Sequence, residues 1–377
     1  MSLLVRGFVA ALVVATSFGT SADAIDEIVD GELGAQLDEY LSRLEANGMS
    51  GAFLVAKDGE VALAKGYGLA DRERGVPVTT DTVFTVGSIT KQFTAAGILK
   101  LEEEGKLAVE DSIRKHLKEL PRNKRDVTIH HLLTHASGLR ADFGGDYANM
   151  SAEKMIEKFG DADLKTIPGE VHDYSNPGYS VLGVLVQRLS GKGYEEYLRK
   201  ALFEPVGMMD TGYLLPDWSA DRMAHGYTQS GLDWGTVREK RWAEDGPHWN
   251  LRANGGIMST IGDMYKWHLA LQGDAVLSEA SKAKLFARHI PENPEGSSFY
   301  GYGWAIFKTE RDTDLIAHNG GNGIFLADFR RYVDEDIVIL LMTNDQQTVT
   351  NQNQRDIRRL VFGFPVELPA LKTSAEE

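Results

Sequence analysis

Ser88 and Lys91 are the residues of this chain whose types and spacing most directly predict chemistry. Three positions are almost one helical turn, so in a helix both side chains project from the same face. A serine hydroxyl becomes a strong nucleophile when a base takes its proton, and a lysine can be that base once its own proton has been driven off. The pair therefore predicts a serine hydrolase that works by acyl transfer.

The same spacing occurs three more times, so the surroundings must decide which pair is reactive. The other pairs are Ser112/Lys115, Ser151/Lys154 and Ser281/Lys284. Their charged neighbours predict solvated surface, and Ser151 has the position of a helix N-cap. Ser88 instead opens a small and apolar segment, residues 93–99, typical of a buried helix that ends near Gly105. Lowering a lysine pKa from about 10.4 to about 7 takes roughly 4 kcal/mol, which burial supplies and solvent does not.

Tyr174-Ser175-Asn176 forms a second constellation, because it precedes an apolar helix over residues 181–186. A tyrosine beside a buried ammonium can lose its proton more easily, so Tyr174 and Lys91 could share one proton. Asn176 offers a donor and an acceptor to the lysine or to a substrate amide. The alternative is a core tyrosine in a turn. A second Y-x-N at Tyr147 stands in a Gly/Asp loop with no such helix behind it.

These residues need a scaffold, and the apolar patterns predict an α/β (α+β) fold with an antiparallel sheet. Residues 51–57 and 60–67 alternate as strands around Asp58-Gly59, a strong hairpin signal. Further strands are predicted over residues 302–308, 314–318, 324–331 and 337–342, and helices around residues 37–44 and 357–361. The sheet is built from both chain ends, about 25–87 and 290–377, and is flanked by helices. A mainly helical lobe, about 88–289, is inserted between them, which puts Ser88 at the junction of the lobes, a usual place for a cleft.

Composition predicts an exported protein. Residues 1–24 carry Arg6, an apolar run over residues 8–15 and the small-residue cleavage site Ala22-Asp23-Ala24, so we expect a signal peptide cleaved after Ala24. The run is too short to span a membrane, and we expect no stable membrane insertion after cleavage. The chain has no cysteine, and its net charge of −15 argues against nucleic-acid binding. Residues 25–377 contain no linker or repeat and are expected to form one domain in the periplasm or outside the cell.

Ser88-x-x-Lys91, Tyr174-Ser175-Asn176 and His318-Asn319-Gly320, in this order, resemble the serine β-lactamase and penicillin-binding superfamily, and specifically its class C-like branch. Other segments similar to that branch are residues 132–139, 203–208, 253–260 and 300–304. The resemblance implies a β-lactamase/transpeptidase-like fold in which Ser88 is acylated and Lys91 and Tyr174 act as general base and acid. It also implies an oxyanion hole formed by the backbone N–H groups of Ser88 and Gly321, with Asn176, His318 and Gly320 orienting the substrate. No metal or organic cofactor is implied.

His318 departs from the lysine that begins this motif in classical lactamases and D,D-peptidases. With an ordinary pKa of about 6.5 it is mostly neutral at pH 7 and is a weak partner for a substrate carboxylate. We therefore expect esters or D-amino-acid amides and peptides as small-molecule or peptide substrates, with a β-lactamase or D,D-carboxypeptidase as the alternative. From another class, a noncatalytic peptidoglycan-binding protein of the same fold would not need Ser88, Lys91 and Tyr174 together. The oligomeric state stays open, and the neighbouring His130, His131 and His135 are not expected to hold a metal.

Overall fold

The structure, a computed structural model, describes residues 25–139 and 142–371. The expected signal peptide, residues 1–24, lies outside the described residues. Within the described ranges, no helix combines the length and apolar character needed to cross a membrane.

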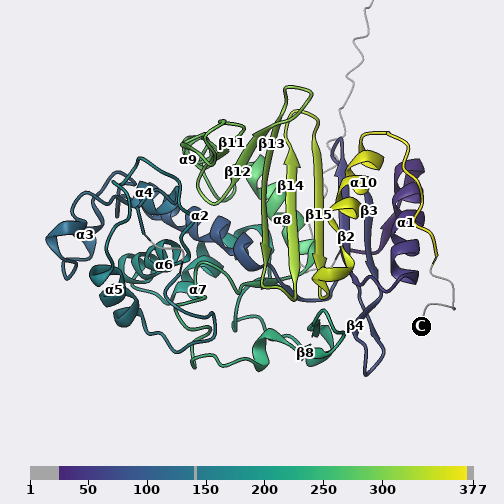
Figure 1. Cartoon of the computed structure of the whole chain (residues 1–377), viewed down its shortest axis with the longest axis horizontal. Coiled ribbons are helices and arrows are strands. Elements are labelled where there is room, and N and C mark those ends of the chain that lie inside the picture. Colours follow the sequence, from purple (N-terminus) through teal and green to yellow (C-terminus); the bar gives the residue numbers. More distant parts are fainter. Residues whose placement is uncertain (1–24, 140–141, 372–377) are drawn as a thin grey trace, which may run out of the picture.

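A nine-stranded antiparallel sheet, formed by the described residues of both chain ends, is the main scaffold (Figure 1). Its spatial order is β1-β3-β2-β15-β14-β13-β12-β11-β10. The two ends of the chain meet where β2 pairs with β15 along the whole length of both strands. The fold class predicted from the sequence is therefore confirmed. The strands of this sheet are β1 (Ile28–Val29), β2 (Gly51–Lys57), β3 (Glu60–Tyr67), β10 (Ile290–Pro291), β11 (Ser298–Tyr300), β12 (Ala305–Lys308), β13 (Asp314–Gly321), β14 (Leu326–Tyr332) and β15 (Ile337–Thr343).

The turn chemistry explains which strand boundaries the sequence predicted well. Asp58 and Gly59 both have positive φ, 54° and 79°, as a two-residue hairpin turn requires, and β2 and β3 have the expected bounds. The strand predicted over residues 302–308 is present only over Ala305–Lys308, as β12. A turn at Gly303, with φ of 78°, separates the short strands β11 and β12. Short two-stranded ribbons complete the strands: β4 (Leu69–Asp71) with β5 (Val76–Pro77), β6 (Phe84–Thr85) with β9 (Met258–Ser259), and β7 (Gly226–Tyr227) with β8 (Asp233–Gly235).

Helices cover both faces of the sheet. In Figure 1, α1 and α10 lie together on the outer side, while the inserted helical lobe surrounds α2 on the other side. The helix α8, within the stretch 88–289, packs directly on β15 and β2. The helices are α1 (Gly31–Ala46), α2 (Thr90–Glu103), α3 (Ile113–His116), α4 (Ile129–Leu133), α5 (Ala152–Asp161), α6 (Asn176–Ser190), α7 (Tyr194–Leu198), α8 (Ile261–Gln272), α9 (Glu279–Leu285) and α10 (Asn351–Val361). Shorter helical turns are η1 (Gly87–Ile89), η2 (Arg122–Lys124), η3 (Arg199–Phe203), η4 (Glu204–Val206), η5 (Ala220–Arg222), η6 (Val237–Glu239) and η7 (Gln346–Thr348).

Two large apolar clusters fix the position of α2. Alternate residues of β2 point to opposite faces, so Phe53 packs with α1 and α10 while Leu54 packs with the helical lobe. The cluster on the Leu54 side is continuous from the sheet into the helices and includes Ile89 and Phe93. Nearly every residue of α2 is buried, as the apolar segment 93–99 predicted. A rigid, buried helix therefore begins at the junction of sheet and helical lobe.

Candidate active site

Ser88 and Lys91 lie where η1 leads into α2, the helix at the centre of the molecule. Lys91 Nζ is 3.1 Å from Ser88 Oγ. Lys91 is 0% exposed, whereas Ser88 is half-buried and lines a cavity. The predicted contact is therefore present, with the base buried and the nucleophile within reach of a ligand.

Lys91 is held by neutral acceptors. Its Nζ donates to the side-chain oxygen of Asn176 at 2.9 Å and to the main-chain oxygen of Asn254 at 2.7 Å. Burial lowers the pKa of Lys91 well below its ordinary value, and the more distant carboxylate of Asp146 partly opposes that shift. The amine is thereby favoured over the ammonium, and a neutral amine beside Ser88 Oγ can accept the serine proton.

Tyr174 reaches the same hydroxyl, but its proton is held more tightly than the sequence predicted. Burial raises the pKa of Tyr174 above its ordinary value, and a hydrogen bond with the Ser88 side chain only partly opposes this. Lys91 Nζ lies over the ring of Tyr174, 4.7 Å from its centre. The expectation that this ammonium would make Tyr174 more acidic is wrong because burial dominates. The lowered pKa of Lys91 favours its neutral amine, and the raised pKa of Tyr174 favours its protonated hydroxyl.

The backbones of η1 and β13 approach each other closely beside Ser88. A Cβ on Gly320 would lie 2.1 Å from the oxygen of Val86 and 2.5 Å from the nitrogen of Ser88, and one on Gly87 would lie 2.6 Å from the nitrogen of Gly321. Any side chain at either glycine would push the two segments apart. Glycine at 87 and 320 therefore permits the contact that brings the amides of Ser88 and Gly321 near each other.

Strand pairing leaves the amide of Gly321 free to face the nucleophile. Asn322 N–H donates to the oxygen of Phe325, and bonded and non-bonded pairs alternate along an antiparallel ladder. Gly321, opposite Leu326, is thus a non-bonded pair, and its N–H points away from β14. On its other side, β12 pairs with β13 only as far as Ala317. This geometry fits the oxyanion hole that the resemblance implies.

His318 does not present a free ring nitrogen. Its Nε2 is 3.0 Å from the hydroxyl of Tyr300, and its Nδ1 is 2.6 Å from the main-chain oxygen of Asn319. Burial, with the nearby charge of Lys91, lowers the pKa of His318 to about 4. The ordinary pKa assumed from the sequence was wrong because β13 carries this ring into the interior. In this arrangement His318 orients its own strand and makes no countercharge for a substrate carboxylate.

A chain of hydrogen bonds continues from His318 to the second motif. The hydroxyl of Tyr300 is 3.2 Å from His135 Nε2, and the N–H of Ser175 donates to His135 Nδ1 at 3.0 Å. The ring of His135 also packs on Tyr174, with centroids 4.1 Å apart. Burial lowers the pKa of His135 as well, so each imidazole is neutral and can donate at one nitrogen and accept at the other. Buried neutral groups therefore tie the loop of Tyr174 to β13.

A cavity of about 60 Å³ opens at Ser88. Among the described residues that line it, none is lysine, arginine or histidine, and Asp146 is the one carboxylic acid. The cavity is therefore small and its ionised wall is negative. Its lining residues are Thr85, Gly87, Ser88, Asp146, Tyr147, Asn176, Val237, Leu251, Asn254, Gly255, Gly256, Gly321, Asn322 and Phe325.

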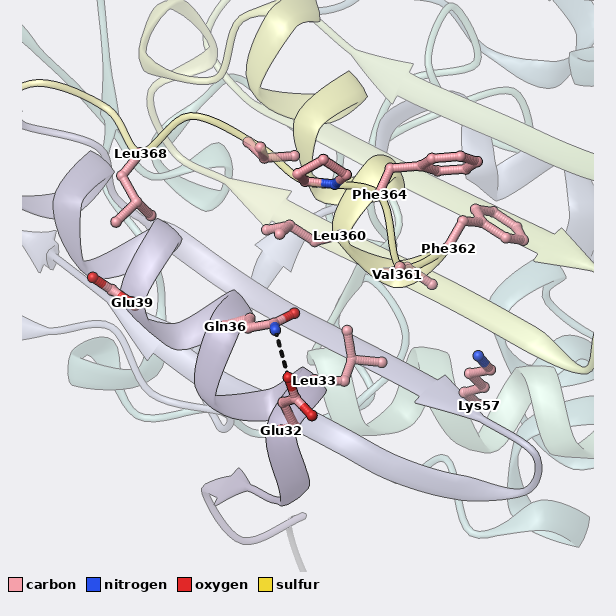
Figure 2. Close-up of a pocket in the computed structure, with 13 residues that line it drawn as sticks. Glu32, Leu33, Gln36, Glu39, Lys57, Leu360, Val361, Phe362, Phe364 and Leu368 are labelled. Atoms are coloured by element: carbon pink, nitrogen blue, oxygen red, sulfur yellow. Dashed lines mark hydrogen bonds between the residues drawn. The ribbon is translucent and has the colours of Figure 1, made fainter.

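A larger hollow, of about 760 Å³, lies elsewhere, between α1 and the C-terminal segment (Figure 2). Leu33 and Leu360 face each other across it, and Gln36 donates to Glu32 along its edge. The helices α1 and α10 pack on the sheet face opposite α2, so the sheet separates this hollow from Ser88. Its size does not make it the reactive site, because the described residues that line it include no serine, histidine or tyrosine.

The other serine and lysine pairs differ from Ser88 and Lys91. Ser151 caps α5 by accepting from the N–H of Lys154, as predicted. Ser112 is half-buried and donates to the oxygen of Arg125. The prediction of solvated surface is wrong for Ser281, which is 5% exposed and donates to Glu103 at 2.6 Å. Glu103 lies on α2, 178 positions away, and no residue near Ser281 in the sequence indicates this contact.

Five residues of the site were not identified as functional from the sequence. Asn254, His135 and Tyr300 stand in segments similar to the family, but their contacts with Lys91, Ser175 and His318 cross long stretches of chain. Asp146 lies in the Gly/Asp loop whose Y-x-N was set aside. The tyrosine of that Y-x-N, Tyr147, lines the cavity too. In the part of the chain that the structure describes, no group of three or more metal-ligating side chains is arranged to hold a metal ion.

Comparisons with known proteins place the chain in a family. The Beta-lactamase family profile matches residues 36–363. Penicillin-binding protein 4* of Bacillus subtilis (strain 168) is 28% identical over 345 residues, which cover 86% of this chain and 75% of that protein. The solved octameric penicillin-binding protein homologue from Pyrococcus abyssi has a TM-score of 0.74 at 27% identity, covering 88% of this chain and 77% of that chain. The D-amino acid amidase from Ochrobactrum anthropi SV3, solved with L-phenylalanine, shares the fold with a TM-score of 0.73 at 23% identity, over 88% of this chain and 99% of that chain. The chain belongs to the Beta-lactamase family, as a class C-like member.

Proposed function

We propose that this protein is an exported serine hydrolase that cleaves esters, or amides and peptides of D-amino acids, through an acyl-enzyme. The observation that carries the proposal is the 3.1 Å contact between Ser88 Oγ and the buried Lys91 Nζ. The family consists of serine hydrolases and penicillin-binding proteins, and the pairing of a nucleophile with a desolvated base is what such chemistry requires.

The proposed reaction has two halves. Lys91 takes the proton of Ser88 as Oγ attacks the substrate carbonyl, and the amides of Ser88 and Gly321 receive the negative charge that develops on the carbonyl oxygen. Tyr174 then gives its proton to the departing alcohol or amine, and the Lys91 ammonium restores it. In the second half, water attacks the acyl carbon and gives one proton to Lys91. The Lys91 ammonium returns this proton to Ser88 Oγ as the bond between Oγ and the acyl carbon breaks, and the acid leaves. Apart from the attacking water, no step needs a group outside this chain and its substrate.

The substrate class follows from charge. A carboxylate on the substrate would need a cation, yet the described lining of the cavity has none and His318 is neutral above its pKa of about 4. These features support uncharged esters or amides over β-lactams and C-terminal carboxylate peptides. The fold likeness to a D-amino acid amidase is compatible with this class. Export is supported by the signal-like composition of residues 1–24.

The test is an assay of the purified mature protein on a chromogenic cephalosporin, short-chain nitrophenyl esters and D-aminoacyl anilides. We expect turnover of an ester or anilide at much higher kcat/KM than of the cephalosporin. Ser88→Ala should lower kcat by about three or more orders of magnitude. A fluorophosphonate adduct should map to Ser88 by peptide mass spectrometry.

Ser112→Ala is the matched control, because Ser112 and Lys115 have the same spacing on the surface of the protein. This variant should keep the native rate and the adduct. An adduct on another serine, or undiminished turnover in Ser88→Ala, contradicts the assignment of the nucleophile. A preference for the cephalosporin would instead favour a β-lactamase.

A further inference from the structure

We propose that Asp146 forms a subsite for a cationic amine of the substrate, so that amino-acid esters and amides with a free amino group are preferred over their uncharged analogues. This inference rests on the proposed serine-hydrolase function and specifies its substrate class.

Asp146 shares a small cavity with the nucleophile. It lies on the loop between α4 and α5 and lines the same cavity of about 60 Å³ as Ser88 and Asn176. A substrate whose carbonyl carbon is next to Ser88 Oγ has little space for its acyl group. A charged substituent on the carbon attached to that carbonyl therefore lies close enough to Asp146 for the two charges to interact.

Within residues 25–139 and 142–371, the carboxylate of Asp146 has no cation of its own. Among the residues that the structure describes, Asp146 makes no ion pair within 4.0 Å, whereas Asp111 has both Lys115 and His116. Burial raises the pKa of Asp146 and the charge of nearby Asp142 adds to this, while the charge of Lys91 opposes it. A half-buried carboxylate without an ion-pair partner is stabilised when a cationic ligand binds to it. An ammonium group supplies such a cation and adds a charge-assisted hydrogen bond.

Lys91 is not the missing partner. Its Nζ is occupied by hydrogen bonds to Ser88, Asn176 and Asn254. The charge of Asp146 raises the pKa of Lys91, which works against a base that must be neutral. An ammonium bound at Asp146 cancels that attraction and favours the amine form of Lys91. A substrate with an ammonium group would thus bind more tightly and would also increase the fraction of Lys91 that is in the neutral amine form.

The test compares D-alanine p-nitroanilide with propionyl p-nitroanilide, which differs only in lacking the amino group, at pH 7. In the native enzyme the kcat/KM ratio of the first to the second should be well above one. Asp146→Asn should lower this ratio about ten- to a hundredfold, as expected for the loss of one charge-assisted hydrogen bond. Asp142→Asn is the matched control: it removes the same charge from the same loop, but Asp142 lines a different hollow on the surface. It should change the ratio less than about twofold.

A native ratio at or below one overturns the subsite without any variant, so the test survives a variant that fails to fold. An equal fall of both rates in Asp146→Asn also overturns it, and would make Asp146 a base for the attacking water instead. An equal change of the ratio in both variants would show an effect of net charge only. Turnover of p-nitrophenyl propionate and fluorophosphonate labelling of Ser88 separate the two proposals: if both are present, only the subsite has failed, and if both are absent, the hydrolase function has failed with it.

Discussion

Lys91 and His318 flank Ser88 from α2 and β13, and both are buried basic groups whose pKa burial lowers. They differ in their hydrogen-bond partners. Lys91 Nζ contacts the nucleophile, whereas the two ring nitrogens of His318 contact Tyr300 and the main chain of Asn319. A lowered pKa therefore does not by itself identify a reactive group. The group becomes reactive when its freed lone pair faces an atom that must lose a proton.

Lys124 extends this comparison. It is as buried as Lys91, at 0% exposure, and burial lowers its pKa too. Its Nζ donates to the main-chain oxygen of Ala162 at 2.6 Å, in the helical lobe. Burial lowers the pKa of Lys124 less than that of Lys91, and Lys124 contacts a carbonyl without a serine hydroxyl beside it, so its role is structural.

The largest expected effect is that of Lys91→Met. Removing the base should slow acylation of Ser88 by about 10³- to 10⁴-fold, within the range of general base catalysis. The rate of fluorophosphonate labelling measures this step directly. Lys124→Met is the matched control, since it removes a lysine of equal burial, and its labelling rate should equal that of the native protein. A similar loss in both variants would mean that burial of a lysine, and not its contact with Ser88, explains the effect.

Tyr174→Phe should have the next largest effect. It removes the hydroxyl that contacts Ser88 and that would protonate the leaving group, and should lower kcat about a hundredfold. Because Tyr174 and Lys91 would handle one proton in sequence, the double variant should be scarcely slower than Lys91→Met alone. A double-mutant cycle on a p-nitrophenyl ester measures this. Fully multiplicative losses would show that the two residues act independently.

Local signals explain why the scaffold and the reactive pair could be predicted. Asp58-Gly59 fixes the turn of β2 and β3, and the apolar residues 93–99 indicate the buried helix that desolvates Lys91. The spacing of Ser88 and Lys91 then brings their side chains together with no help from distant parts of the chain. The short strand β11 was missed because its edge is set by the turn at Gly303, inside an otherwise continuous β pattern.

Long-range contacts explain what could not be predicted. Tyr300 reaches His135 across 165 positions, and this contact occupies the hydroxyl that His318 also uses. The burial of Ser281 likewise depends on Glu103 of α2, 178 positions away. A pKa depends on such neighbours and on desolvation, so the ordinary pKa assumed for His318 and the lowered pKa expected for Tyr174 were both wrong.

The smallest expected effect concerns His318, the second buried base of the comparison. Its ring should not titrate in the range where an ordinary histidine does. The hydrogen bonds of His318 assign its proton to Nδ1, which donates to Asn319, and leave Nε2 to accept from Tyr300. With a pKa of about 4, the ring should stay neutral from pH 8 to pH 5.5, whereas an ordinary histidine would be about nine-tenths protonated at pH 5.5.

Two-bond ¹H–¹⁵N spectra of protein labelled at histidine report both tautomer and charge, and the signal is assigned by its loss in His318→Gln. We expect one protonated and one unprotonated nitrogen throughout this range. A midpoint between pH 6 and 7, or a proton on Nε2, would contradict the buried chain through Tyr300 and restore His318 as a cationic partner for a substrate carboxylate at mildly acidic pH.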